Sequence, residues 1–256
     1  MEIYGLIGEK LGHSFSKKYF TEKFETEGIN ARYEMFELPD ISDFPLLVAN
    51  NNFSGLNVTI PYKEKIIPFL NELDPVAEAV GAVNTIRFIR SKAHTVLKGY
   101  NTDVAGFANS FAPLLQPQHK SALILGTGGA SKAVAYALKT LNIDYRFVSR
   151  NPSGEIYSYQ QLTKEIIEQY KVIIHCSPVG TFPNIDAAPD IPYQYLSSGH
   201  LLYDLVYNPE KTLFCQLGEE RGATIKTGLD MLYGQAAAAW GIWVQMFDEE
   251  RVIGVK

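Results

Sequence analysis

Short apolar runs alternate with amphipathic segments along the first hundred residues of the chain. An apolar run of roughly 4–8 residues bounded by turn residues is typical of a strand, whereas apolar positions at helical spacing indicate a helix. Phe20 and Phe24 have the helical spacing, so we predict a helix over residues 16–27 that ends at Gly28. Strands are predicted at residues 3–7, 33–38, 56–60, 83–89 and 95–99.

A second series of the same kind begins after Pro117. Strands are predicted at residues 122–125, 145–148, 172–176, 201–206 and 223–226, and helices at 131–141 and 230–247. Strands that are separated by helices need crossover connections, which produce mainly parallel sheets. A helix that carries Phe107 and Phe111 runs into Pro113, and we place a domain boundary at its start. We therefore predict two α/β domains with a cleft between them, the first over residues 1–103 and the second over 104–229.

The composition narrows the class of protein. Apolar residues make up 46% of the 256 residues and charged residues 20%, as in globular chains. The net charge of −5 argues against binding of nucleic acid, which needs a basic surface. Cys176 and Cys215 form no Cys-x-x-Cys pair, so we expect no metal site and a reducing compartment. No signal peptide is visible and no apolar stretch approaches ~20 residues, so we expect a cytoplasmic protein that does not bind membranes.

The most specific single motif is a glycine-rich turn between a predicted strand and a predicted helix. It reads Gly126-Thr127-Gly128-Gly129-Ala130. Gly126 permits the tight turn, and Gly128 lets the backbone approach a pyrophosphate, whose charge the amides of the helix start then face. Ser131 stands where the strict pattern has a third glycine, and serine is small enough for close helix–strand packing. The turn predicts a Rossmann-like, doubly wound dinucleotide-binding domain.

The end of the next predicted strand indicates which dinucleotide binds. NAD sites carry Asp or Glu about 20 residues after the turn, where the carboxylate accepts hydrogen bonds from the ribose hydroxyls. This chain has Ser149 and Arg150 there, and the next acidic residue is Glu155. Because a guanidinium pairs well with a 2′-phosphate, we expect NADP as the cofactor.

Two polar stretches in the first half stand out against apolar flanks. His13-Ser14-Phe15-Ser16 places two hydroxyls at a helix start, which favours an anion, although Ser14 could be a plain N-cap. Residues 57–63 bring Thr59 and Lys63 to the end of a strand. A lysine at a helix start meets the positive end of the helix dipole, and this unfavourable placement points to a function.

Asn84 and Asp103 are polar residues at the edges of apolar segments. Taken alone, Asp103 could simply cap the helix that follows it. Together, however, Lys63 and Asp103 would form a charged pair that is able to serve a proton transfer during the reduction of a carbonyl.

Taken in order, these residues resemble the shikimate dehydrogenase family, and the resemblance covers almost the whole chain. It rests on the following motifs: His13-Ser14-x-Ser16, residues 57–63, Gly81-Ala82-Val83-Asn84-Thr85, Asn101-Thr102-Asp103, Gly126-x-Gly128-Gly129-Ala130-Ser131, Ser149-Arg150, residues 203–209 and Gly228-Leu229-Asp230-Met231-Leu232-x-x-Gln235. Three residues depart from the family pattern: Lys17 for a usual proline, Tyr62 for phenylalanine, and Asn151 for a threonine after Arg150. The last departure weakens the expectation of a strict preference for NADP.

The resemblance implies a reversible, NADPH-dependent reduction of 3-dehydroshikimate to shikimate, on the route to chorismate and the aromatic amino acids. It implies that Lys63 and Asp103 are the catalytic pair. The residues implied to bind the substrate are Ser14, Ser16, Thr59, Asn84, Tyr207 and Gln235. The cofactor-binding set is Gly126, Thr127, Gly128, Gly129, Ala130, Ser149, Arg150, Leu205 and Gly228. The helix at about residues 230–256 would pack back on the first, substrate-binding domain, in a monomer or homodimer whose partner is a small-molecule substrate.

Three alternatives stay open. A related enzyme of the same fold oxidises quinate as well as shikimate, often with NAD, but Arg150 without a nearby acid speaks against it. A folate-linked methylene dehydrogenase shares the two-domain plan, but the paired serines favour a carboxylate substrate. A catalytically inactive dinucleotide-binding sensor would not need Lys63 and Asp103.

We interpret His94, His119 and His200 as solvated histidines, because they lack metal-ligand spacing, and His175-Cys176 as a buried pair.

Overall fold

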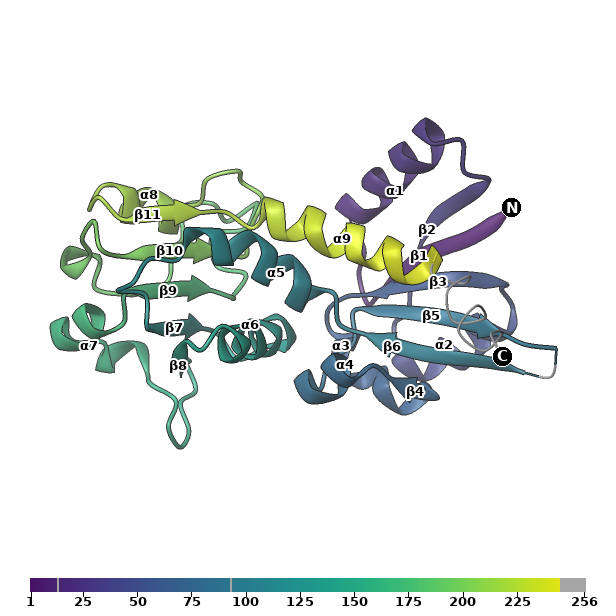
Figure 1. The fold of residues 1–256 in the computed structure, drawn as a ribbon, viewed down its shortest axis with the longest axis horizontal. Helices are drawn as coiled ribbons and strands as arrows, with labels where there is room; N and C mark the ends of the chain where they lie inside the picture. Colours follow the sequence, from purple (N-terminus) through teal and green to yellow (C-terminus); the bar gives the residue numbers. More distant parts are fainter. Residues whose placement is uncertain (13, 93, 245–256) are drawn as a thin grey trace, which may run out of the picture. The chain divides into compact units, whose positions relative to one another are not determined.

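The computed structural model describes residues 1–12, 14–92 and 94–244, and the chain divides into two compact units (Figure 1). The first unit consists of Met1–Thr102 together with the chain from Ala236 onward, and the second unit is Asp103–Gln235. His13 of the paired-serine motif lies outside the described residues, as does the part of the expected C-terminal helix beyond Val244.

The first unit contains a mixed sheet that is mainly parallel. Its strands are β1 (Glu2–Gly8), β2 (Ala31–Glu37), β3 (Phe53–Val58), β4 (Glu72–Leu73), β5 (Thr85–Arg90) and β6 (Thr95–Tyr100). The strand order is β2-β1-β3-β5-β6-β4, and β5 alone runs opposite to its neighbours. Its helices are α1 (Phe15–Thr26), α2 (Phe44–Ala49), α3 (Tyr62–Lys65) and α4 (Pro75–Val80).

Local sequence signals set the bounds of these helices. In α4, the Asp74 side chain accepts a hydrogen bond from the backbone N–H of Val76 (2.9 Å), and Pro75 occupies the first helical position. Gly81 ends the helix in the left-handed conformation (φ 68°), which glycine adopts without strain. The chain then turns into β5, with Asn84 directly before the strand.

Both faces of the first sheet are covered. One core packs below α2, α3 and α4 around Phe53, Leu56 and Ile86. The other core joins α1 to the second half of α9 (Leu229–Val244), whose Trp243 packs against the sheet. The Trp243 indole N–H donates to the carbonyl of Ile86 (3.1 Å), and its ring occupies the space that a Cβ at Gly55 would fill.

The second unit contains a five-stranded, fully parallel sheet in the order β11-β10-β9-β7-β8. The strands are β7 (Ser121–Leu125), β8 (Asp144–Val148), β9 (Val172–His175), β10 (Leu201–Asp204) and β11 (Thr224–Lys226). The helices are α5 (Asp103–Phe111), α6 (Gly129–Thr140), α7 (Lys164–Gln169), α8 (Leu213–Glu219) and the first half of α9. One face packs on α5 and α6, and the opposite face on α7 and α8.

The strand order reverses at β7, because β8 and β9 lie on either side of it. Ligands of open α/β sheets bind outside the carboxyl ends of the strands at such a reversal. The predicted α/β fold with mainly parallel sheets is confirmed. Within the described part of the chain, no helix has both the length and the apolar character needed to cross a membrane.

Candidate active site

Loops that carry polar side chains meet at one edge of the first sheet. Because β1 and β3 are parallel while β5 is antiparallel to β3 and β6, the carboxyl ends of β1, β3 and β6 lie beside the amino end of β5. The loops at this edge and the first turns of the helices that follow them carry the predicted substrate and catalytic residues of the first unit: Ser14, Ser16, Thr59, Lys63 and Asn84.

Asn84 joins these loops through buried hydrogen bonds. Its backbone N–H donates to the carbonyl of Tyr100 (3.0 Å), and its own carbonyl accepts from the N–H of Val58 (2.8 Å). Its side-chain oxygen accepts the backbone N–H of Thr102 (2.8 Å), and its amide nitrogen donates to the Thr102 hydroxyl (2.9 Å). The end of β6, and with it the residue before Asp103, is therefore held at this edge.

Lys63 is held next to Asn84 by its backbone, since its carbonyl accepts the N–H of Val83 (2.7 Å). The helix that contains it, α3, has only four residues. Lys63 lies at a helix start, as predicted, but it meets no strong helix dipole there, because one turn of aligned peptides builds little macrodipole. What singles out Lys63 is its place among the polar side chains at the sheet edge.

Thr59 follows β3 directly and lies against the end of β1. Its N–H donates to the carbonyl of Ile7 (2.9 Å). A Cβ at Gly8 would lie 2.8 Å from the Thr59 methyl, so only glycine allows the two loops to approach this closely.

The two serines of the first loop have different surroundings. Ser14 is the N-cap of α1 and accepts the N–H of Lys17 (3.3 Å), while its hydroxyl hydrogen remains available for donation. The Ser16 side chain hydrogen-bonds to the hydroxyl of Tyr33, which donates to the side-chain oxygen of Asn57 (2.8 Å). Burial raises the pKa of Tyr33, so this hydroxyl keeps its proton at neutral pH. Sequence reasoning missed Tyr33, because a tyrosine inside an apolar strand has the pattern of a core residue.

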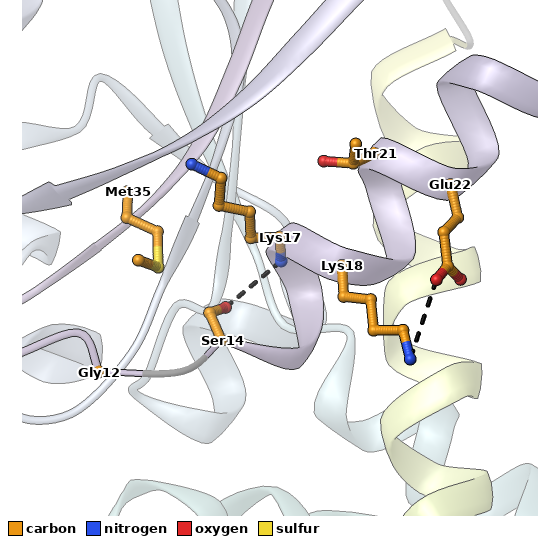
Figure 2. A pocket seen from close by; sticks show the side chains of 7 residues that line it. All are labelled: Gly12, Ser14, Lys17, Lys18, Thr21, Glu22 and Met35. Atoms are coloured by element: carbon orange, nitrogen blue, oxygen red, sulfur yellow. Dashed lines mark hydrogen bonds and ion pairs between the residues drawn. The ribbon is translucent and has the colours of Figure 1, made fainter.

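An open hollow of about 450 Å³ lies beside α1 (Figure 2). It is lined by Gly12, Ser14, Lys17, Lys18, Thr21, Glu22 and Met35. Figure 2 shows Lys18 directed toward Glu22, and these two side chains form an ion pair (3.8 Å). Lys17 pairs with Glu34 (3.1 Å). Because both lysines of the hollow face carboxylates and its lining shares only Ser14 with the candidate substrate set, we do not assign the substrate to it.

Asp103 and Gln235 lie on two helices of the second unit that pack closely. Asp103 is buried in the first turn of α5. One turn later, a Cβ at Gly106 would lie 2.9 Å from the backbone nitrogen of Gln235 in α9, so glycine permits this close packing. The Gln235 side chain is 9% exposed and donates to the carbonyl of Leu232 (3.1 Å).

The glycine turn has the geometry that a dinucleotide site needs. Gly126 has φ 119°, which favours glycine, and a Cβ there would lie 3.3 Å from the Cys176 carbonyl. The space around the Cβ position of Gly128 is open, so a phosphate could approach its backbone. Ser131 is fully buried and donates to the carbonyl of Gly128 (2.5 Å), and thus takes the third-glycine position without opening the helix–strand packing. The first amides of the twelve-residue α6 follow directly.

Arg150 follows β8 and is exposed, and within the described ranges no ion pair or hydrogen bond of its guanidinium is found. The nearest acid along the chain, Glu155, pairs instead with Arg146. No carboxylate from this loop thus occupies the position of a ribose-binding acid. The Ser149 hydroxyl accepts the N–H of Asn151 (3.2 Å), which shapes the loop.

The remaining predicted residues lie at the carboxyl ends of β10 and β11. A Cβ at Gly228 would lie 2.3 Å from the carbonyl of Leu205, so glycine is required where these segments meet. Tyr207 follows two residues after Leu205 and is 41% exposed. Leu205, Gly228 and Tyr207 therefore share the sheet edge of the glycine turn.

A buried polar network that no sequence motif predicted lies at this edge. His175 and Asp204 end β9 and β10 with both side chains fully buried, and His175 Nδ1 donates to the Asp204 carboxylate (2.9 Å). Asp204 also accepts from the Thr212 hydroxyl (2.5 Å) and the Val206 N–H (2.9 Å). His175 Nε2 bonds to the Ser177 hydroxyl (2.7 Å). The network ties together the loops beside the glycine turn. His175 is buried, as predicted, and its partner is Asp204, whereas Cys176 is only partly buried.

Two further histidines are buried, contrary to prediction. His119 and His200 are 5% and 1% exposed. Their Nδ1 atoms accept the backbone N–H groups of Gln116 (3.1 Å) and Ser197 (3.0 Å). Both residues lie just before strands of the second sheet, and their imidazole rings hydrogen-bond to the backbone of the loops there. The prediction of a solvated side chain is confirmed for His94, which is exposed.

Comparison with known proteins identifies relatives along the whole chain. Residues 6–86 match the family model described as the shikimate dehydrogenase substrate binding domain. A shikimate dehydrogenase (NADP(+)) of Clostridium botulinum (strain Hall) is 35% identical over 254 residues, which cover 95% of this chain and 96% of that protein. A chorismate mutase/shikimate 5-dehydrogenase fusion protein from Clostridium acetobutylicum has a similar crystal structure (TM-score 0.84, 35% identity, 95% of this chain and 91% of that one). Shikimate 5-dehydrogenase from Thermus thermophilus, solved with NADP(H) and shikimate, is also similar (TM-score 0.82, 28% identity, 95% and 94% covered). This chain therefore belongs to the shikimate dehydrogenase family.

Proposed function

We propose that this chain catalyses the reversible reduction of 3-dehydroshikimate to shikimate with NADPH. The observation that carries the proposal is the combination of a polar sheet edge in the first unit with a dinucleotide turn in the second and an arginine there, Arg150, that forms no ion pair with any described residue. The relatives support it, since the Clostridium botulinum protein is named shikimate dehydrogenase (NADP(+)) and the Thermus protein was solved with NADP(H) and shikimate.

The substrate is a small carboxylate whose ring bears hydroxyls and a carbonyl, so it needs a few polar partners at fixed positions. In the proposed complex, the Ser14 hydroxyl donates to the carboxylate, and the Ser16 hydroxyl turns from Tyr33 to donate to it as well. The polar side chains proposed to contact the ring oxygens are those of Thr59, Lys63, Asn84, Asp103, Tyr207 and Gln235. The buried bonds of Asn84 support this role, because a fixed amide discriminates better between hydroxyl patterns than a mobile one.

In the proposed reaction NADPH, when bound, supplies a hydride to the carbonyl carbon. The Lys63 ammonium donates a proton to the carbonyl oxygen as negative charge develops there, and the Asp103 carboxylate pairs with that ammonium and orients it. Asp103 follows Thr102 by one peptide bond, and Thr102 is held by Asn84 beside the backbone of Lys63. In the reverse direction, the same pair takes the proton from the substrate hydroxyl.

Three observations in the second unit favour NADP as the cofactor. Gly126 and Gly128 leave the backbone open for a pyrophosphate, and the amides of α6 follow. Arg150 has no ion pair in the described part of the chain, and Glu155, which could otherwise oppose a 2′-phosphate, is bound to Arg146. We therefore assign the pyrophosphate to the turn and the 2′-phosphate to Arg150.

The proposal is tested by incubating the purified chain with NADPH and either 3-dehydroshikimate or 3-dehydroquinate. We expect NADPH to be consumed with 3-dehydroshikimate and an equal amount of shikimate to form, as measured by absorbance and mass spectrometry. A chain that consumes NADPH faster with 3-dehydroquinate, or with neither compound, does not have the proposed function.

A further inference from the structure

The segment after the Arg150 loop returns to lie alongside the end of β8. The Tyr157 N–H donates to the carbonyl of Phe147 (2.9 Å), and the Ser149 N–H donates to the carbonyl of Tyr157 (2.9 Å). These bonds form a parallel bridge between Tyr157 and the last residue of β8. Arg150 and Tyr159 each follow this bridge by two residues, so both leave it at the same end.

Tyr159 has a fixed backbone and a half-buried ring. It begins a 3₁₀ helix (Tyr159–Gln161), and the Gln161 side chain accepts the N–H of Ser158 (2.7 Å). The ring packs against the core below α7 and α8. Among the residues that the structure describes, no hydrogen bond to the Tyr159 hydroxyl is found, although the neighbouring Tyr193 hydroxyl donates to the carbonyl of Pro189 (2.9 Å).

Groups that follow β8 and β9 act electrostatically on the Tyr159 hydroxyl. Burial raises the pKa of Tyr159, Arg150 opposes this rise, and Cys176 and Asp190 add to it. Arg150 follows β8 and Cys176 follows β9, so the hydroxyl is within electrostatic range of the loops on both sides of β7. Because its pKa is raised, the hydroxyl keeps its proton at neutral pH and can donate it to an anion.

We propose that the Tyr159 hydroxyl donates a hydrogen bond to the 2′-phosphate of NADP, beside the Arg150 guanidinium. An arginine and a hydroxyl that leave this bridge at the same end would contact two oxygens of one phosphate from different directions. The nearby Ser149 hydroxyl accepts the N–H of Asn151 and still has its own hydrogen to donate, so Tyr159 would be a second hydroxyl donor on this side of the loop. This inference rests on the proposed use of NADP.

The test compares two small ligands that differ only in the 2′-phosphate, 2′,5′-ADP and 5′-AMP, by isothermal titration calorimetry. In Tyr159→Phe we expect the Kd of 2′,5′-ADP to rise about 5- to 20-fold and that of 5′-AMP to change less than about twofold. Tyr145→Phe is the matched control, because it removes a hydroxyl from the opposite end of β8, and it should bind both ligands like the unaltered chain.

The outcomes distinguish the role of Tyr159 from the assignment of NADP. If the unaltered chain prefers 2′,5′-ADP and Tyr159→Phe keeps the full preference, the role of Tyr159 is overturned while the NADP assignment stands. If the unaltered chain shows no preference for 2′,5′-ADP, the NADP assignment fails and the inference fails with it. If Tyr159→Phe weakens both ligands equally, Tyr159 is a packing residue and the proposed hydrogen bond is absent.

Discussion

At the scale of single residues, the proposed chemistry depends most on Lys63. In Lys63→Ala no group at this position can protonate the carbonyl oxygen, so kcat should fall by about 10²-fold or more with little change in KM. Steady-state kinetics with 3-dehydroshikimate and NADPH measures both constants.

The control for this prediction is Lys65→Ala, an exposed lysine on the same short helix, which should retain the kinetics of the unaltered chain. A Lys63→Ala variant with nearly unaltered kcat would remove Lys63 from the catalytic pair and leave its ammonium no more than a surface charge.

Arg150 is the residue that we expect to determine the preference for NADP over NAD. Replacing it by glutamine removes a charge-assisted contact to the 2′-phosphate, so the KM for NADPH should rise by about 10- to 100-fold. The KM for NADH, which lacks that phosphate, should stay nearly constant. Arg221→Gln, at an exposed arginine after α8, controls for a general loss of positive charge. Equal changes with NADPH and NADH would place the phosphate elsewhere.

At the scale of elements, the buried Asp204 network holds the ends of β9 and β10 in place. Asn at position 204 offers one oxygen and an amide where the carboxylate accepts three hydrogen bonds, so buried donors lose partners. We expect Asp204→Asn to lower the stability by about 3 kcal/mol.

Calorimetric melting of Asp204→Asn tests this prediction, since each kcal/mol corresponds to roughly 2–4 °C in a chain of this size. Asp186→Asn, at an exposed position in a loop of the same unit, should melt like the unaltered chain. An unchanged melting temperature in Asp204→Asn would show that the network contributes little to holding β9 and β10.

The elements that sequence reasoning could predict are those with a clear local pattern. The apolar runs of β7 and β9 and the apolar face of α6 carry their own periodicity, and their predicted positions are close to those observed. Helices of four to seven residues, such as α3 and α8, span too few turns for a periodicity to show. The two-residue β4 exists only through its pairing with β6, a contact that no local signal announces.

Site residues that are brought together only by the folded chain could not be predicted from local patterns either. Tyr33 and Asn57 are 24 positions apart, and His175 and Asp204 are 29 apart, so only the folded sheets bring each pair together. His119 stands in a polar stretch that looks solvated, and its burial follows from the closing of loops against the second sheet. Motifs of contiguous residues, by contrast, could be interpreted before the fold was known.

At the scale of the whole molecule, two buried histidines predict acid sensitivity. Burial lowers the pKa of His119 and of His200, and each Nδ1 accepts a backbone N–H, which requires the neutral ring. The unfolded chain, with ordinary histidine pKa values of about 6.5, binds protons first as the pH falls. Their contribution to stability is therefore present above about pH 6.5 and is lost as the pH drops toward the lowered folded pKa values.

Melting temperatures between about pH 7.5 and pH 5 test this prediction. A double variant, His119→Gln and His200→Gln, should be less stable at neutral pH and should lose less of its remaining stability on acidification. His94→Gln, at an exposed histidine, should follow the unaltered chain. Parallel curves for the unaltered chain and the double variant would assign the acid sensitivity to other groups.

The chain should prefer one pairing of substrate and cofactor, shikimate with NADP⁺, and one assay measures this preference directly. The rate of nicotinamide reduction is followed with shikimate or quinate, each combined with NADP⁺ or NAD⁺. We predict that kcat/KM for shikimate with NADP⁺ exceeds each of the other three combinations by about 100-fold or more. A higher efficiency with NAD⁺ or with quinate, or no turnover with any pair, would contradict the account.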